Sequence, residues 1–152
     1  MNTGVRAIHR RGAENAEAPQ REVTEKIIGA AIEAHQLLGP GLLESVYPQA
    51  LQIEFALRGI RFEAQAPVPL IYKGRAMAAP LKLDLLVDGV VIMEIKAVQR
   101  LEPIHTAQLL TYLRLTGLTS GLLLNFNEIT LKQGIQRVSN SLRLSAYSAP
   151  LR

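Results

Sequence analysis

The rest of this chain is arranged around one segment, LKLDLLVDGVVIMEIKAVQRLEPIHTAQLLTYL, residues 81–113. Two apolar runs rich in Leu, Val and Ile flank the turn dipeptide Asp88-Gly89, and a helical period begins after Pro103. The segment is therefore predicted to form a β-hairpin followed by a helix.

Three ionisable residues, Asp84, Glu94 and Lys96, lie in the otherwise apolar strands of this hairpin. A charge surrounded by apolar strand residues costs several kcal/mol unless it is paired or binds a metal, so its presence calls for a reason. Side chains alternate along a strand, which places Glu94 and Lys96 on the face of Ile92.

The register of the hairpin decides whether Asp84 joins that face. A two-residue turn at Asp88-Gly89 would pair Val87 with Val90 and would place Asp84 on the opposite side of the sheet from Glu94. A three-residue loop, residues 88–90, would instead place Asp84 directly opposite Glu94. We expect the second register, or a bulge with the same effect.

Composition limits the class of protein. The chain has 152 residues, of which 48% are hydrophobic, which suits one domain with a real core. The net charge of +4 is compatible with a polyanionic partner but does not argue for one. The chain has no cysteine, hence no disulfide or thiolate metal site, and no apolar run of membrane-spanning length. We expect a soluble, cytoplasmic protein with no membrane association.

Three regions are predicted: a flexible tail over residues 1–22, one domain over residues 23–140 and a C-terminal extension over residues 141–152. Thr24 is predicted to cap a helix that ends at Gly39-Pro40-Gly41. His35 in that helix is expected to be packed or exposed rather than a metal ligand, because no second His or Cys lies one turn away.

The remaining pattern predicts an α/β (α+β) domain with a mixed sheet. Pro48 requires the second helix to begin near residues 45–47 or to be kinked, which places Glu44 at or just before a helix N-terminus, where an acid can simply cap or offset the dipole. The other expected elements are a broken edge strand over 61–72, a short strand near 76–79, a helix over 103–116, a strand over 120–126, and a strand pair or a strand with a short helix over 129–138.

His105, Gln108 and Tyr112 form a polar stripe along the helix that follows the hairpin. Such a stripe is usually the solvent face of a helix, and without other evidence that interpretation holds.

Two facing carboxylates on neighbouring strands can hold Mg²⁺ or Mn²⁺, because hard cations prefer oxygen ligands. A lysine one strand step away can orient or deprotonate water, or offset charge that builds up on a phosphate. Asp84, Glu94 and Lys96 therefore favour metal-dependent phosphodiester hydrolysis. The alternative is a structural ion pair in which Lys96 neutralises Glu94.

Four segments resemble the GxxExxY proteins, a group within the PD-(D/E)XK nuclease-like superfamily, and the resemblance covers about residues 23–140. Gly41, Glu44 and Tyr47 match the motif that gives the group its name. The segments are GPGLLESVY (39–47), LDLLVDGVVIMEIKAV (83–98), HTAQLLTYLRLTG (105–117) and GLLLNFN (121–127).

The resemblance implies a restriction-endonuclease-like core, a mixed β-sheet flanked by helices. It implies that Asp84, Glu94 and the carbonyl of Ile95 bind the metal, that Lys96 acts at the water, and that Glu44 reaches the metal site. Gln108 with Tyr112 matches a QxxxY motif, which makes Gln108 a candidate catalytic residue. The expected substrate contacts are Tyr112, His105 and Lys82.

Two residues depart from the family pattern: Pro48 follows the motif tyrosine, and Lys82 stands where many relatives have Arg. The implied function is hydrolysis of nucleic acid with Mg²⁺ or Mn²⁺, with DNA ahead of RNA as the substrate and a homodimer as one arrangement. The alternative is a module of the same fold that binds nucleic acid or a partner with little or no hydrolysis. The intact set of Asp84, Glu94 and Lys96 argues against that alternative.

Overall fold

The computed structural model describes residues 3–78 and 81–140, with side chains described from residue 19 onward. Within these ranges one five-stranded sheet has the strand order β1-β4-β5-β6-β7. β5 and β6 are parallel, whereas the other neighbouring strands are antiparallel. The strands are β1 (Phe62–Val68), β4 (Leu81–Val87), β5 (Val91–Lys96), β6 (Ser120–Asn125) and β7 (Ile135–Ser139).

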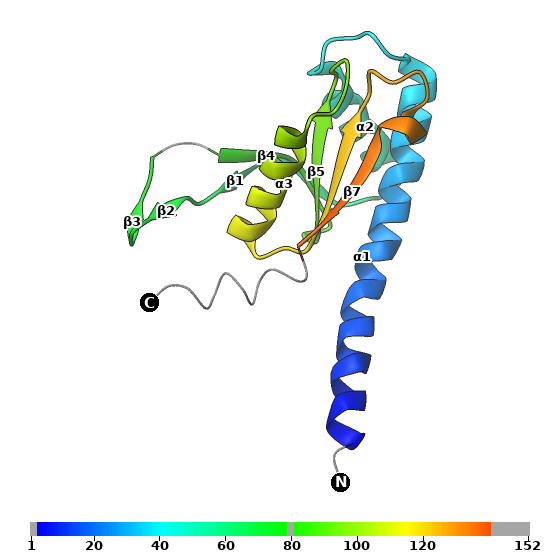
Figure 1. Ribbon diagram of the computed structural model, residues 1–152. Coiled ribbons are helices and arrows are strands. Elements are labelled where there is room, and N and C mark those ends of the chain that lie inside the picture. The colour runs from blue at the N-terminus through cyan, green and yellow to red at the C-terminus, as the bar shows by residue number, and fades with distance from the viewer. Residues whose placement is uncertain (1–2, 79–80, 141–152) are drawn as a thin grey trace.

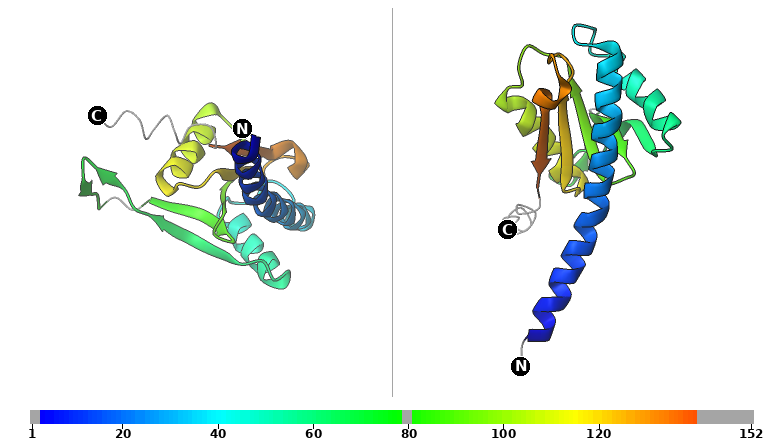
Figure 2. Two further views of the ribbon diagram at one scale, coloured as in Figure 1. Left: turned by 90° about the horizontal axis from the view of Figure 1, so that it is seen from below. Right: turned by 90° about the vertical axis from the view of Figure 1, so that its right-hand side faces the viewer.

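Helices cover both faces of the sheet (Figures 1 and 2). α1 (Thr3–Leu38) and α2 (Val46–Leu57) pack on one face, and α3 (Pro103–Thr116), which connects the parallel strands β5 and β6, packs on the other. Met93 of β5 lies in the first core and Ile92 in the second, as alternating strand side chains require. The predicted α+β fold with a mixed sheet and flanking helices is confirmed.

The expected start of the first helix at Thr24 is wrong. α1 begins at Thr3 and contains Pro19, so residues 3–22, predicted as a flexible tail, are helical, and α1 extends beyond the sheet (Figure 2). The helical backbone bonds are local and need no apolar face, which is why the absence of apolar periodicity misled the prediction. Among the described helices, none has the length and apolar character to cross a membrane. The C-terminal extension, residues 141–152, lies outside the described residues.

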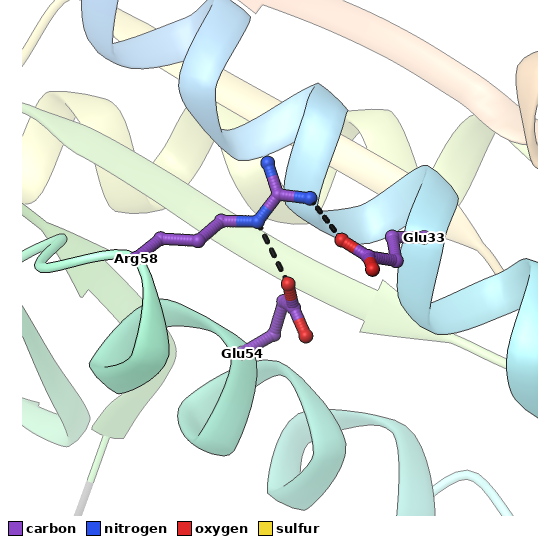
Figure 3. A network of polar contacts seen from close by, with 3 residues as sticks. All are labelled: Glu33, Glu54 and Arg58. Atoms are coloured by element: carbon purple, nitrogen blue, oxygen red, sulfur yellow. Dashed lines mark hydrogen bonds and ion pairs between the residues drawn. The ribbon is translucent and has the colours of Figure 1, made fainter.

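An ionic contact joins α1 to α2 (Figure 3). The guanidinium of Arg58, at the end of α2, donates to the carboxylates of Glu54, at 2.7 Å, and of Glu33 on α1. α2 itself begins at Val46, so Pro48 lies in its first turn, where the missing N–H leaves no helical bond unmade. The predicted start near residues 45–47 is confirmed.

The register of the central hairpin is also confirmed. Val87 pairs with Val91 and Leu85 with Met93, while Asp88 and Gly89 both take positive φ in the turn. α3 runs from Pro103 to Thr116 as predicted, because proline suits a first helical turn and Gly117 adopts the left-handed conformation at its end.

The remaining strands follow the prediction except for the short strand expected at 76–79. β1 is an edge strand, and the chain after it forms a separate small hairpin of β2 (Ile71–Tyr72) and β3 (Arg75–Ala76), which projects away from the sheet (Figure 1). The short strand expected at 76–79 therefore overlaps β3 only at Ala76. The last region is a short helix, η1 (Leu131–Gly134), followed by β7, which is one of the two expected arrangements.

Candidate functional site

The site begins where the strand ladder is interrupted. β1 pairs with β4 at Leu85 and at Leu83, but not at Asp84 between them, where Gln65 of β1 takes a φ of 51°. On the other side, the paired residues of β4 and β5 end at Leu85 and Met93. Asp84 thus lies at a break in both ladders, and its neighbour in β5 by continuation of the register is Glu94.

Carboxylate groups replace the missing ladder bonds at this break. Oδ2 of Asp84 accepts the Ile95 N–H at 2.9 Å, and Oε1 of Glu94 accepts the Asp84 N–H at 3.3 Å. The two bonds hold the side chains of Asp84 and Glu94 against each other between the strands. The hairpin register and these two hydrogen bonds bring the two carboxylates together, as expected.

Glu94 is only 4% exposed, and this burial raises the pKa of its carboxyl to about 8. The charge of Asp84 raises the pKa further, whereas the Asp84 N–H and the nearby Lys96 lower it. A raised pKa at one carboxyl, with partial relief from a nearby lysine, is what two like charges held together in a buried place produce. Without a bound cation, the Glu94 carboxyl of the folded chain therefore retains its proton at neutral pH.

Lys96 lies at the end of β5 and reaches α3. Its Nζ donates to Oε1 of Gln108 at 3.4 Å, and Nε2 of Gln108 donates to the hydroxyl of Tyr112 at 3.0 Å. Part of the polar stripe of α3 therefore faces the hairpin rather than only solvent. The contacts form a line of polar groups from Lys96 across the helix to the 9% exposed Tyr112.

Glu44 approaches the same end of β5 from the loop before α2. Its Oε1 accepts the N–H of Ala97, the residue after Lys96, at 2.9 Å. Tyr47, which is fully buried, fixes this loop because its hydroxyl donates to the Gly39 carbonyl at 2.8 Å and accepts the Leu42 N–H at 3.1 Å. A side chain at position 47 thereby determines where Glu44 lies.

Gly41 adopts a φ of 92°, a region that favours glycine, and its N–H donates to Oδ1 of Asn127 at 3.1 Å. The motif residues 41, 44 and 47 thus have separate physical tasks: a turn, a carboxylate at the strand end, and an anchor for the loop.

Two asparagines with positioning roles were missed by the sequence analysis. The fully buried Asn125 accepts the Val98 N–H at 3.0 Å and donates to the Val98 carbonyl at 2.9 Å, which holds the chain as it leaves β5. Asn127 holds the Gly41 loop. The only available signal was the presence of amide side chains at the end of an apolar strand, and that signal does not identify the distant partners.

Of the expected substrate contacts, His105 is hydrogen-bonded within α3 and its cap, whereas Lys82 is exposed on β4. Nδ1 of His105 accepts the Glu102 N–H at 2.9 Å and so caps the start of α3. Lys82 is exposed on β4, two residues before Asp84. His35, for which a packed or an exposed position was expected, is packed: its Nε2 lies 2.8 Å from the Glu128 carbonyl oxygen, and its ring lies against Phe126. The roles given to His105 and Lys82 stay predictions.

The oxygen donors of Asp84 and Glu94, next to the Ile95 backbone, have the chemistry that a hard divalent cation prefers. Over residues 19–78 and 81–140, whose side chains are described, however, no three side chains of the His, Cys, Asp and Glu types gather as a metal site. Glu44 is therefore not assembled with Asp84 and Glu94. The donor types fit Mg²⁺ or Mn²⁺, and the full ligand set of Asp84, Glu94, Ile95 and Glu44 stays a prediction.

Comparison with known proteins agrees with this fold. A model of the PD-(D/E)XK nuclease superfamily matches residues 21–138, which include the hairpin, the loop of Glu44 and α3. Searches of curated proteins and of solved structures give no match. The match covers most of the chain and is compatible with the narrower GxxExxY group. On this evidence the chain belongs to the PD-(D/E)XK nuclease superfamily.

Proposed function

We propose that this protein is a metal-dependent nuclease that hydrolyses phosphodiester bonds of nucleic acid. The observation that carries the proposal is the pair Asp84 and Glu94, held together at a break in the strand ladder with Lys96 two residues further along β5. A fold has no structural need for a carboxylate pair of which one member, Glu94, is buried, because like charges repel and burial penalises the charge. Membership of the nuclease superfamily supports the same conclusion.

In this proposal Asp84, Glu94, the Ile95 carbonyl and Glu44 would hold Mg²⁺ or Mn²⁺. The bound ion would supply Lewis acidity at the phosphate and lower the pKa of a water molecule. Asp84 and Glu94 would supply the negative charge that attracts the ion and would keep it at the break in the strand ladder. Glu44 would need to exchange its bond with the Ala97 N–H for one to the ion.

Lys96 would orient the attacking water and offset negative charge on the phosphate as the bond breaks. Gln108 accepts from Lys96 and so fixes where the ammonium lies, while Tyr112 in turn holds Gln108. Lys82 and His105 would contact the nucleic acid backbone. We also propose DNA rather than RNA as the substrate, a cytoplasmic location and a homodimer as one working arrangement.

The chain offers a matched pair of variants for the test, because it contains only two aspartates, Asp84 and Asp88. Asp88 lies in the hairpin turn and pairs with Arg61, and asparagine tolerates its positive φ. Purified protein is incubated with single- and double-stranded DNA and RNA in Mg²⁺, Mn²⁺ or EDTA. We expect metal-dependent cleavage by the wild type and by Asp88→Asn, but not by Asp84→Asn.

Cleavage that persists in Asp84→Asn would contradict the proposal, as would cleavage that is equal in EDTA. Binding of nucleic acid without any cleavage, by protein that is folded and supplied with metal, would instead support the binding module of the same fold. Comparison of the four nucleic acids decides between DNA and RNA, and circular against linear substrates decides between endonuclease and exonuclease action.

A further inference from the structure

A cavity lies on the other face of the sheet from Glu94. This α1–β7 pocket has a volume of about 330 Å³. It is lined on one side by α1 and on the other by the start of β6 and the end of β7. α1 passes beside this edge of the sheet in the views of Figures 1 and 2. Its polar lining includes Arg21, Thr24, Thr119, Ser120, Arg137 and Ser139.

The pocket is separate from the candidate nuclease site. Ser120 begins β6, whereas Glu94 is paired with Leu123 and Lys96 with Asn125, about 10 Å and about 16 Å further along at the rise of a strand. Leu122, which lines the pocket, belongs to the core under α1, whereas Ile92, on the face of Glu94, belongs to the core under α3. The two sites therefore open on opposite faces.

The charge of the pocket is positive. Arg21 comes from α1 and Arg137 from β7, and neither forms an ion pair with any residue in the described ranges. None of the described lining residues is Asp or Glu. The other arginines whose ion pairs are seen, Arg58 and Arg61, are each matched to a carboxylate. Two uncompensated guanidinium groups at one cavity favour an anionic ligand.

A hydroxyl without a protein partner supplies the second observation. Thr24 lines the pocket and is only 5% exposed, yet its side chain makes no hydrogen bond to a described residue. The hydroxyl oxygen itself is not among the buried side-chain atoms that lack a partner, so it is open to solvent, and a ligand in the pocket could accept its proton without displacing a protein partner. Thr119, by contrast, already donates to Gln20 at 3.3 Å across the same pocket.

We propose that the α1–β7 pocket binds a phosphate group. Arginine forks from α1 and β7 and the hydroxyls of Thr24 on α1 and Ser120 on β6 offer donors from several directions, which suits a tetrahedral phosphate better than a planar carboxylate. The group is either a terminal phosphate monoester or a phosphodiester of a nucleic acid backbone. This inference does not depend on catalysis, because binding can be measured in EDTA whether or not the protein cleaves nucleic acid.

The test measures the melting temperature and affinity of the full chain with inorganic phosphate, against chloride at equal ionic strength, in EDTA. We expect phosphate to raise the melting temperature of the wild type. Arg137→Gln should weaken phosphate binding by more than about tenfold, because it removes one of two cations at the site. The matched control is Arg75→Gln on the exposed strand β3, which should bind phosphate as the wild type does.

Thr24→Val keeps the shape of the side chain and removes only the hydroxyl. Without phosphate it should melt at the same or a higher temperature, and with phosphate its stabilisation should be smaller, a combination that a merely structural role would not give. Short oligonucleotides with and without a 5′-phosphate distinguish the two sources of the group. A phosphate effect equal to that of chloride, or unchanged in both Arg137→Gln and Thr24→Val, would overturn the proposal and mean an adventitious ion only.

Discussion

Glu94→Gln should change the pH dependence of stability in a way that can be calculated from the structure. The glutamine keeps the shape and the oxygen that accepts the Asp84 N–H, but it cannot ionise. In the wild type the carboxyl has a pKa of about 8 in the folded chain against an ordinary value of 4.5. Below pH 4.5 it is protonated in both the folded and the unfolded chain, and its contribution to stability is fully present.

As pH rises from 4.5 to about 8, the unfolded chain ionises Glu94 while the folded chain does not. The free energy of unfolding then falls by about 1.4 kcal/mol per pH unit, a total of about 5 kcal/mol from this group. Above pH 8 the loss is complete. Glu94→Gln should therefore match the wild type near pH 4.5 and exceed it by several kcal/mol at pH 9.

Urea denaturation in EDTA between pH 4.5 and pH 9 measures this difference, and EDTA keeps metal from replacing the proton. Glu63→Gln is the matched control, because Glu63 is exposed on β1 and its replacement should leave the pH profile parallel to that of the wild type. A constant gap between Glu94→Gln and the wild type across the whole pH range would refute the reasoning.

Three further outcomes follow from the site. Millimolar Mn²⁺ should raise the melting temperature of the wild type but not of Asp84→Asn, and an equal shift in both would mean no specific metal site. Lys96→Ala should lose most cleavage activity while its Mn²⁺ affinity is kept or improved, and Lys96→Arg should lose cleavage activity likewise. If Lys96 only formed a structural ion pair with Glu94, Lys96→Ala would mainly lower the melting temperature. Full cleavage by a folded Lys96→Ala would rule out the nuclease role of Lys96. Tyr47→Phe removes two hydrogen bonds of the Gly39–Leu42 loop and should lower the free energy of unfolding by about 2 kcal/mol in urea titrations; an unchanged value would contradict the anchoring role.

The parts of the fold that could be predicted depend on local signals. Asp88-Gly89 with its flanking apolar runs was sufficient for the hairpin but left two registers open, and the observed one was preferred because it places Asp84 opposite Glu94. Pro103 with Gly117 was sufficient for both ends of α3. Once the register is right, the meeting of Asp84 and Glu94 follows from the alternation of strand side chains. The start of α1 was missed because a helix that extends past its packing partner shows no apolar pattern.

The parts that could not be predicted depend on contacts between distant segments. Asn127 holds Gly41 across 86 positions, and Asn125 holds Val98 across 27, and no local pattern in the chain announces either pairing. The polar stripe of α3 was ambiguous for the same reason, since only the packed helix shows that Gln108 reaches Lys96 while His105 caps its own helix. The catalytic and metal-binding roles of these residues stay predictions.

The carboxylates that interrupt the strand ladder also serve as its substitute rungs, and this links ligation to backbone protection. Any cation that draws Oδ2 of Asp84 toward itself takes that oxygen from the Ile95 N–H, and the same holds for Glu94 and the Asp84 N–H. Deuterium uptake at these two amides therefore reports how the carboxylates are engaged. Metal-bound and metal-free protein should differ in deuterium uptake at the Ile95 and Asp84 amides. The amides of Leu86 and Ile92, a pair nearer the hairpin turn, should exchange slowly in both states.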